Sequence, residues 1–209
     1  MKKINLLFMT FLALTAQNVM AQDNDDTNVD QHELQVLVQE VALLDIWDAS
    51  LATPADVGVI AFDMGDATTI NTNAEAGLYD FTALSYTDLW LNYTSVVSAA
   101  EPTRNISVRF SGGSFPGGVQ LVITPEESNV ENADNGTPGT IDTANPIKLG
   151  ANDIVTGAAQ SIVTQIESVY TGDEAFGVKL KYTIEQFGSF SNYIAGSYST
   201  QVVYTLSDI

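Results

Sequence analysis

The sequence predicts an all-β protein, an antiparallel sandwich of two sheets with little helix. Apolar and polar residues alternate over many short segments, which is the side-chain period of a half-buried strand. Glycine-rich clusters such as Gly112-Gly113 and Pro116-Gly117-Gly118 separate these segments, as turns do. Strand and helix patterns do not alternate regularly, which disfavours a parallel sheet. Strand order is not encoded in this periodicity, so immunoglobulin-like and jelly-roll topologies both stay open.

Residues 1–21 predict a Sec-type secretory signal peptide. Lys2-Lys3 precedes an apolar run, Ile4 to Ala16, that is too short to span a bilayer, and small residues stand before a cleavage point after Ala21. The mature chain is therefore expected to be secreted, either extracellular or on the cell surface. Its sequence has no later apolar run of membrane-spanning length, so we expect no membrane insertion after cleavage.

The chain is strongly acidic and lacks cysteine. It carries 26 acidic and seven basic residues, a formal net charge of −19, and the signal peptide holds two of the lysines. Such a surface repels phosphate backbones, so nucleic acid is not an expected partner. The absence of cysteine excludes disulfides, thiolate metal sites and thiol nucleophiles. Stability must therefore come from packing.

Residues 22–32 are expected to form a disordered acidic leader, because this stretch is too polar to offset its chain entropy by burial. Residues 33–209 are expected to form a single β-sandwich domain. Its first element is a strand over Glu33–Asp48, in which Leu34, Val36 and Val38 share one face. The alternation changes phase near Glu40, which predicts a bulge; a helix is the alternative.

The same alternation predicts seven further strands. They cover Val57–Phe62, Leu89–Val96, Asn105–Phe110, Val119–Thr124, Ser161–Ile166, Val178–Ile184 and Tyr198–Leu206. A short helix is expected over Asp153–Ser161. The polar stretch Glu126–Pro146 is expected to be a loop or crossover.

No catalytic machinery stands out, and we expect no enzyme activity, no catalytic residues and no cofactor-binding residues. The only histidine, His32, lies beside the leader, whereas a catalytic triad needs a histidine held rigidly near its nucleophile. A glycosidase-type carboxylate pair would be possible in so acidic a chain, but no pair is distinguished by spacing or apolar surroundings.

The polar stretch Glu126–Pro146 also offers candidate ligands for a calcium ion, the only cofactor that the sequence suggests. They are Glu131, Asn132, Asp134 and Asn135. An EF-hand loop aligned on Gly136 would place Ala133 at the third position and Asp142 at the twelfth, so that motif is absent. Calcium can still bind irregular loops rich in Asp and Asn, and ordinary solvated turns are the alternative.

Aromatic residues suggest a second class of partner. Trp47 and Trp90 lie in strand-like segments, where a core position is the default. If they were exposed with Tyr79, Tyr86 or Tyr93, they could stack on sugar rings. The alternative function is therefore a calcium-assisted carbohydrate-binding or matrix-binding module, with a polysaccharide as partner.

Near the C-terminus, Ala195–Leu206 reads AGSYSTQVVYTL, a glycine and a tyrosine before an alternating strand. This segment resembles the closing strand of secreted bacterial immunoglobulin-like subunits of the fimbrial and spore-coat-U kind. The resemblance implies a structural or adhesive β-sandwich subunit that is assembled by donating a strand to a neighbour. The chain departs from many such subunits because it lacks their cysteine pair and carries the long Glu126–Pro146 stretch.

The N-terminal segment Leu34–Ile46 is the candidate for such an assembly strand. Its candidate contact residues are Leu34, Val36, Val38, Val41 and Leu43. An extended apolar segment can add to the open sheet of another subunit through main-chain hydrogen bonds; pairing within its own chain is the alternative. We therefore expect a secreted bacterial surface protein, a structural or adhesive fimbria-like subunit whose partners are further copies or another surface protein.

Overall fold

The computed structural model describes residues 31–51, 57–65, 81 and 84–208. The compact unit Gln39–Ile209 contains every strand of this described part. Residues 31–38 belong to a separate unit and form neither helix nor strand. The predicted signal peptide and residues 22–30 of the predicted leader lie outside the described residues.

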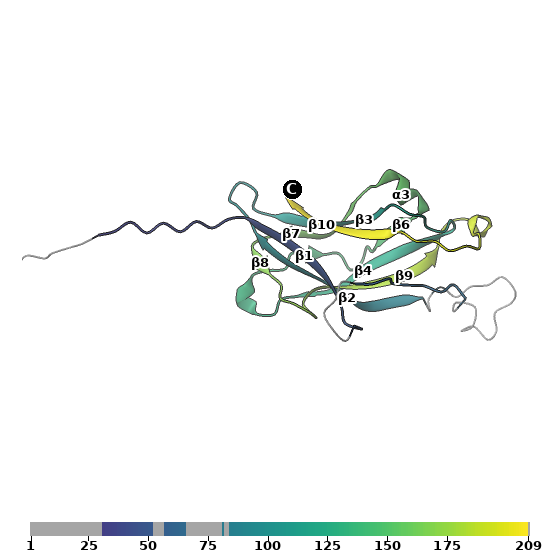
Figure 1. The fold of residues 1–209 in the computed structure, drawn as a ribbon, viewed down its shortest axis with the longest axis horizontal. Coiled ribbons are helices and arrows are strands. Elements are labelled where there is room, and N and C mark those ends of the chain that lie inside the picture. The colour runs from purple at the N-terminus through teal and green to yellow at the C-terminus, as the bar shows by residue number, and fades with distance from the viewer. Residues whose placement is uncertain (1–30, 52–56, 66–80, 82–83, 209) are drawn as a thin grey trace, which may run out of the picture. The chain divides into compact units, whose positions relative to one another are not determined.

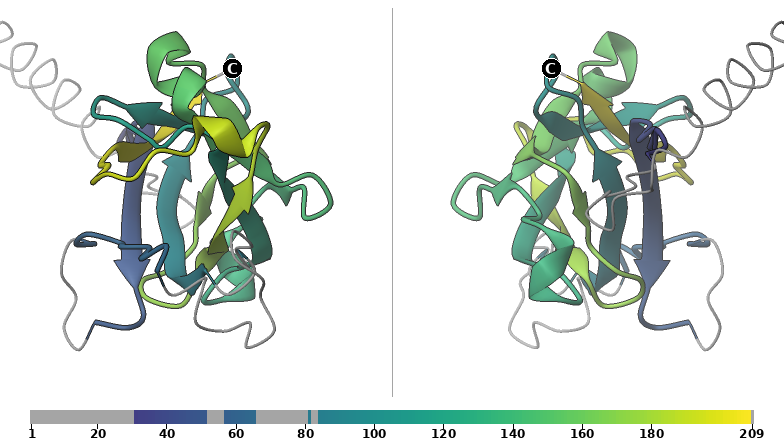
Figure 2. Two further views of the ribbon diagram at one scale, coloured as in Figure 1. Left: turned by 90° about the vertical axis from the view of Figure 1, so that its right-hand side faces the viewer. Right: turned by 90° about the vertical axis from the view of Figure 1, so that its left-hand side faces the viewer.

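Two antiparallel sheets make up the fold, which confirms the predicted all-β sandwich. The larger sheet has the order β1 (Val41–Asp48), β2 (Ser85–Val96), β9 (Gly177–Gln186), β4 (Val119–Asn129) and β6 (Ile147–Gly150), and β8 (Val169–Tyr170) also pairs with β2. The smaller sheet has the order β10 (Gln201–Asp208), β3 (Arg104–Ser111), β7 (Gln160–Ile166) and β5 (Thr140–Ile141). Figures 1 and 2 show the two layers facing each other.

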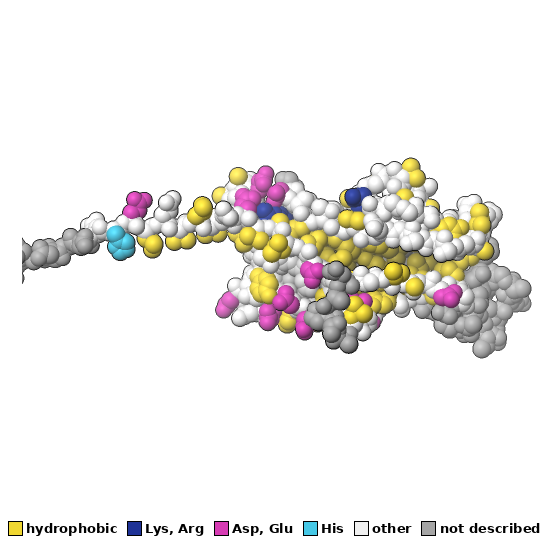
Figure 3. Space-filling model, in the orientation of Figure 1, with side chains coloured by type: hydrophobic (Ala, Val, Ile, Leu, Met, Phe, Trp, Pro, Cys, Tyr) yellow, Lys and Arg dark blue, Asp and Glu magenta, His cyan; other side chains and the backbone are white. Residues whose placement is uncertain are grey.

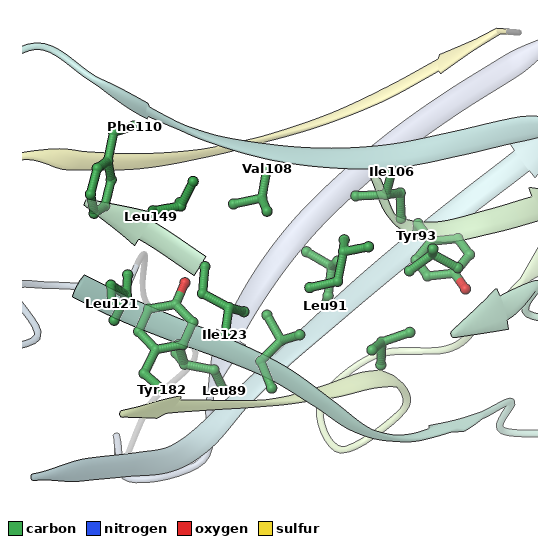
Figure 4. Close-up of a cluster of buried hydrophobic side chains, with 14 of the residues drawn as sticks. Leu89, Leu91, Tyr93, Ile106, Val108, Phe110, Leu121, Ile123, Leu149 and Tyr182 are labelled. Carbon is green, nitrogen blue, oxygen red and sulfur yellow. The ribbon is translucent and has the colours of Figure 1, made fainter. Parts of the chain in front are cut away.

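The hydrophobic core lies between the two sheets (Figure 4). On β3 the predicted alternation is confirmed, because Ile106, Val108 and Phe110 are fully buried while their neighbours Ser107 and Arg109 are partly exposed. Facing them, the larger sheet contributes Leu89, Leu91, Tyr93, Val178, Leu180 and Tyr182. β3 therefore buries one face, as its period of two requires, whereas residues 89–93 of β2 and 119–123 of β4 are buried on both faces.

The first predicted strand is shorter than expected and has no bulge. β1 begins at Val41 and pairs with β2 without interruption, from Val41 opposite Val96 to Asp48 opposite Leu89. The change of phase near Glu40 marks the start of the strand, not a bulge within it. Leu34–Val38 has the same alternation but lies in no strand, since alternation records which residues are apolar and does not supply a strand partner.

The predicted strand Val57–Phe62 is wrong. This segment forms no strand, although Val57, Ile60 and Phe62 are partly buried and pack against the core. The alternation here reflects burial on one side only, and none of the strands in the described residues pairs with the segment.

The predicted loop Glu126–Pro146 is partly strand. β4 continues to Asn129 through a register shift between Pro125 and Glu127. Such irregularities accommodate proline, which cannot donate to the ladder. A single 3-10 turn, η3 (Ala133–Asn135), and the short strand β5 follow.

The other boundaries shift by a few residues. The expected helix over Asp153–Ser161 is α3 (Ala151–Thr156), which ends at Gly157 with a φ of 61°. The left-handed conformation of that glycine stops the helix before β7 begins. The last strand, β10, begins at Gln201, three residues after Tyr198. A second 3-10 turn, η4 (Phe190–Asn192), precedes it.

Candidate assembly interface

β1 and β10 are the edge strands of the two sheets on one side of the sandwich. In the described part of the chain, β1 pairs only with β2 and β10 pairs only with β3. Both edge strands direct apolar side chains into the space between the sheets. These side chains belong to Leu44, Ile46, Val202, Tyr204 and Leu206. We call this region between β1 and β10 the seam. An unpaired edge strand offers main-chain donors and acceptors to another strand.

A shallow hollow of about 290 Å³ lies in the seam. Its walls are Leu44, Asp45, Ile46, Val57 and Tyr204. Figure 3 shows hydrophobic side chains gathered in a band along the gap between the two layers. Contiguous apolar surface of this kind marks interaction sites in soluble proteins. The seam is therefore the candidate interface.

Tyr204 connects the seam to the core. Its hydroxyl oxygen lies 2.7 Å from that of Tyr182 on the opposite sheet. Burial raises the pKa of Tyr182 to about 12. Burial, with the neighbouring Tyr182, also raises the pKa of Tyr204 well above its ordinary value. Both hydroxyls stay protonated near neutral pH, and the hydrogen bond between them connects the two sheets beside the hollow.

These shifts predict that the sandwich loses stability in alkali. Because the folded-state pKa values exceed the unfolded value of about 10, the stabilisation is present below pH 10 and is lost as the pH rises toward 12. A rise in the pKa of Tyr182 from about 10 to about 12 on folding corresponds to a loss of about 2–3 kcal/mol in the free energy of unfolding. Guanidinium unfolding near pH 8 and pH 11.5 measures the loss. The double variant Tyr182→Phe with Tyr204→Phe should lose distinctly less than the native chain; an equal loss would contradict the prediction.

Arg104 closes one end of the seam. Its side chain is only 4% exposed, and its Nε donates to Asp208 Oδ1 of β10 at 2.6 Å. Its Nη1 donates to the Val41 carbonyl of β1 and, at 3.0 Å, to the Val96 carbonyl of β2. A weaker ion pair joins Nη2 to Glu40 at 3.4 Å. One side chain of β3 thereby connects β1, β2 and β10.

A group of carboxylates surrounds this arginine. Oxygens of Glu40, Glu101 and Asp208 lie within 4.8 Å of one another, and all three residues are exposed. At one end of the apolar band, Figure 3 shows acidic side chains gathered beside a basic one. The guanidinium of Arg104 pairs with two of them, Glu40 and Asp208, and so offsets part of their mutual repulsion. Sequence reasoning missed this group, because only the strand pairing brings these distant positions together.

The predicted assembly residues divide into two sets. Val41 and Leu43 lie in β1 opposite Val96 and Thr94, so this part pairs within its own chain. Leu34, Val36 and Val38 lie in no strand and are 74% to 80% exposed. The unpaired candidate segment is therefore Leu34–Val38.

The predicted calcium candidates form a capped turn. Asn132 Oδ1 accepts a hydrogen bond from the Asp134 amide at 3.1 Å and so caps η3. Glu131 and Asp134 are exposed, and Asn135 is partly buried. The carboxamide oxygen of Asn132 is thus already engaged in turn geometry. Calcium binding at this turn stays a prediction.

The aromatic candidates are largely engaged within the fold. Trp90 is 7% exposed with Lys179 Nζ 5.9 Å from its ring centre, and Trp47 is partly buried. Tyr86 donates to Asp48 Oδ2 at 2.5 Å, and Tyr93 is buried with its hydroxyl donating to the Pro138 carbonyl. Tyr79 lies outside the described residues. His32 is exposed. The described aromatic candidates do not form an open sugar-stacking platform.

Across the described residues, no helix is both long and apolar enough to cross a membrane. Comparison of the chain with family models, with curated proteins and with solved structures finds no match in any of the three.

Proposed function

We propose that this chain is a secreted bacterial surface protein, a structural or adhesive fimbria-like subunit without catalytic activity, that assembles by adding Leu34–Val38 to the sheet of a neighbouring copy. One observation carries the proposal: an alternating apolar segment lies exposed and outside any described strand, in a chain whose strands β1 and β10 are edge strands on the same side of the sandwich. The signal-peptide pattern of residues 1–21 and the resemblance of Ala195–Leu206 to secreted subunits support export and assembly.

Magnitudes indicate what such an interface needs. Burying Leu34, Val36 and Val38 would contribute about 1.5–3 kcal/mol for each side chain. Ordering the backbone of a five-residue segment costs about 1–2 kcal/mol for each residue, so the two contributions nearly cancel. Main-chain hydrogen bonds to an edge strand, about 0.5–1.5 kcal/mol each, then decide the outcome. The acceptor must therefore be a free edge beside apolar surface, and the seam has both features.

Variants that place charge on the apolar face of the segment test this proposal. Purified 22–209 is expected to grow into open-ended assemblies with concentration, measured by light scattering and electron microscopy. Val36→Asp with Val38→Asp should stay monomeric, because two carboxylates cannot be buried in the seam. The control, Gln31→Asp with Gln35→Asp, adds the same charge at exposed polar positions and should assemble as the native chain does. A native chain that stays monomeric, or a charged-face variant that assembles normally, would refute the proposal.

A further inference from the structure

The segment Val57–Met64 packs against the core and reaches the seam at Val57, without belonging to either sheet. Val57 is one wall of the hollow, opposite Leu44, Ile46 and Tyr204. Ile60, Phe62 and Met64 are partly buried and pack against the core. The intervening residues Val59, Ala61 and Asp63 are exposed, and Val59 is 94% exposed. This segment thus presents one apolar face to the sandwich, as a strand would.

The main chain of this segment, however, does not pair with either sheet. Within the described part of the chain, no backbone hydrogen bond joins Val57–Met64 to β1, β10 or any other strand. The outer edges of β1 and β10 therefore keep their main-chain groups unpaired by any described strand. The segment covers apolar surface, but it leaves the main-chain donors and acceptors of these edges available to another strand.

We propose that Val57–Met64 is a placeholder: it covers the seam in the isolated subunit and is displaced when Leu34–Val38 of a second copy adds to the free edge of β10. This inference rests on the proposed function. It adds the edge strand that accepts the donated segment, β10, and the segment that controls access to that edge. The second copy is the occupant because its segment offers what the placeholder lacks, an exposed alternating apolar run whose main chain is in no strand.

The exchange has a clear physical basis. The placeholder belongs to the same chain, so its high effective concentration favours it over an incoming segment. The incoming strand buries comparable apolar side chains and also forms a hydrogen-bond ladder with β10. Only the open state binds the donor, so the apparent affinity falls in proportion to the fraction of subunits whose seam is open. Weakening the placeholder should therefore strengthen assembly.

A matched pair of variants of 22–209 tests this direction. Ile60→Asp with Phe62→Asp places charge on the buried face of the placeholder and should lower the midpoint concentration of assembly at least tenfold. Val59→Asp with Ala61→Asp adds the same charge on the exposed face and should change it less than twofold. Adding Val36→Asp and Val38→Asp to the first variant should restore the monomer, which separates strand addition from non-specific aggregation.

A crosslinked variant tests the opposite case, in which the placeholder cannot be displaced. It also tests the proposal if the first variant fails to fold. The chain has no cysteine, so Leu44→Cys with Val57→Cys provides the only two thiols, both at the hollow. A short cleavable thiol crosslinker should hold the placeholder in place and abolish assembly, and cleavage should restore it. The folded state of each variant is checked by near-ultraviolet circular dichroism.

The outcomes separate the two proposals. If the native chain assembles through Val36 and Val38 but neither the loosened nor the tethered placeholder changes the midpoint, the placeholder is refuted and the proposed function stands. A native chain that assembles, together with a loosened variant whose midpoint falls only while the Leu34–Val38 segment is intact, supports both the proposed function and the placeholder. Monomers in the native chain and in every variant refute both.

Discussion

Replacing Arg104 with methionine should lower the free energy of unfolding by about 3 kcal/mol. The guanidinium is 4% exposed and donates to the main-chain carbonyls of Val41 and Val96 as well as to Asp208. Methionine fills part of the volume but leaves the partly buried carbonyls of Val41 and Val96 without this donor. It also removes the cation that separates the carboxylates of Glu40 and Asp208. Urea unfolding at neutral pH measures the change.

Lys148 provides the control for this prediction. It forms an ion pair with Glu185 at 2.6 Å, but both side chains are well exposed, at 49% and 39%. Lys148→Met removes the same charge and should cost only about 0–1 kcal/mol. Arg104→Lys should fall between the two, because it keeps the charge and loses most of the donors. Equal losses for Arg104→Met and Lys148→Met would show that Arg104 contributes only as a surface charge.

Gly177→Ala should be more damaging than Arg104→Met, or should prevent folding. Gly177 begins β9 and has a φ of 77°. A β-carbon there would lie 2.1 Å from the Leu91 carbonyl oxygen of β2, a main-chain atom that cannot rotate away. The ladder between β2 and β9 must therefore separate at the centre of the larger sheet. We expect a loss of about 3 kcal/mol beyond that of the control, by thermal and urea unfolding.

Gly112 is that control. Its φ of 66° is nearly the same, but a β-carbon there would meet nothing within 4 Å. Gly112→Ala should therefore cost only the left-handed backbone penalty, about 1–2 kcal/mol. The difference between the two variants isolates the close approach of β9 to β2. Similar losses at both positions would mean that β2 yields easily to the added methyl group.

The sequence was sufficient to predict the longer strands that pair within the chain, but not the short strands β5, β6 and β8. Asn105–Phe110 and Val178–Ile184 show clean alternation, and both lie inside strands of the sandwich, β3 and β9. Alternation gave the wrong result at Val57–Phe62 and Leu34–Val38. It records the apolar face of a segment, whereas a strand also needs a partner edge, and that partner is not written locally. Both failures concern apolar segments that no described strand pairs with.

The interface could be predicted only in part. The pattern predicts an assembly segment over Leu34–Ile46, but the seam depends on which strands lie at the two sheet edges. The Arg104 group depends on register, because Asp208 lies opposite Arg104 only through the pairing of β10 with β3. Neither edge position nor register follows from the residues taken locally.

The position of β1 also determines how the subunit would respond to pulling. Val38 is separated from the start of β1 by two residues, so a neighbour that binds Leu34–Val38 would transmit tension into β1 at Val41. The eight residue pairs between β1 and β2 would then carry that load. Arg104 holds Val41, the first residue to feel that load, and passes part of it to β3 and β10. Resistance to force is governed by the unfolding rate, so the mechanical strength of such a fibre would depend on this one corner of the sandwich.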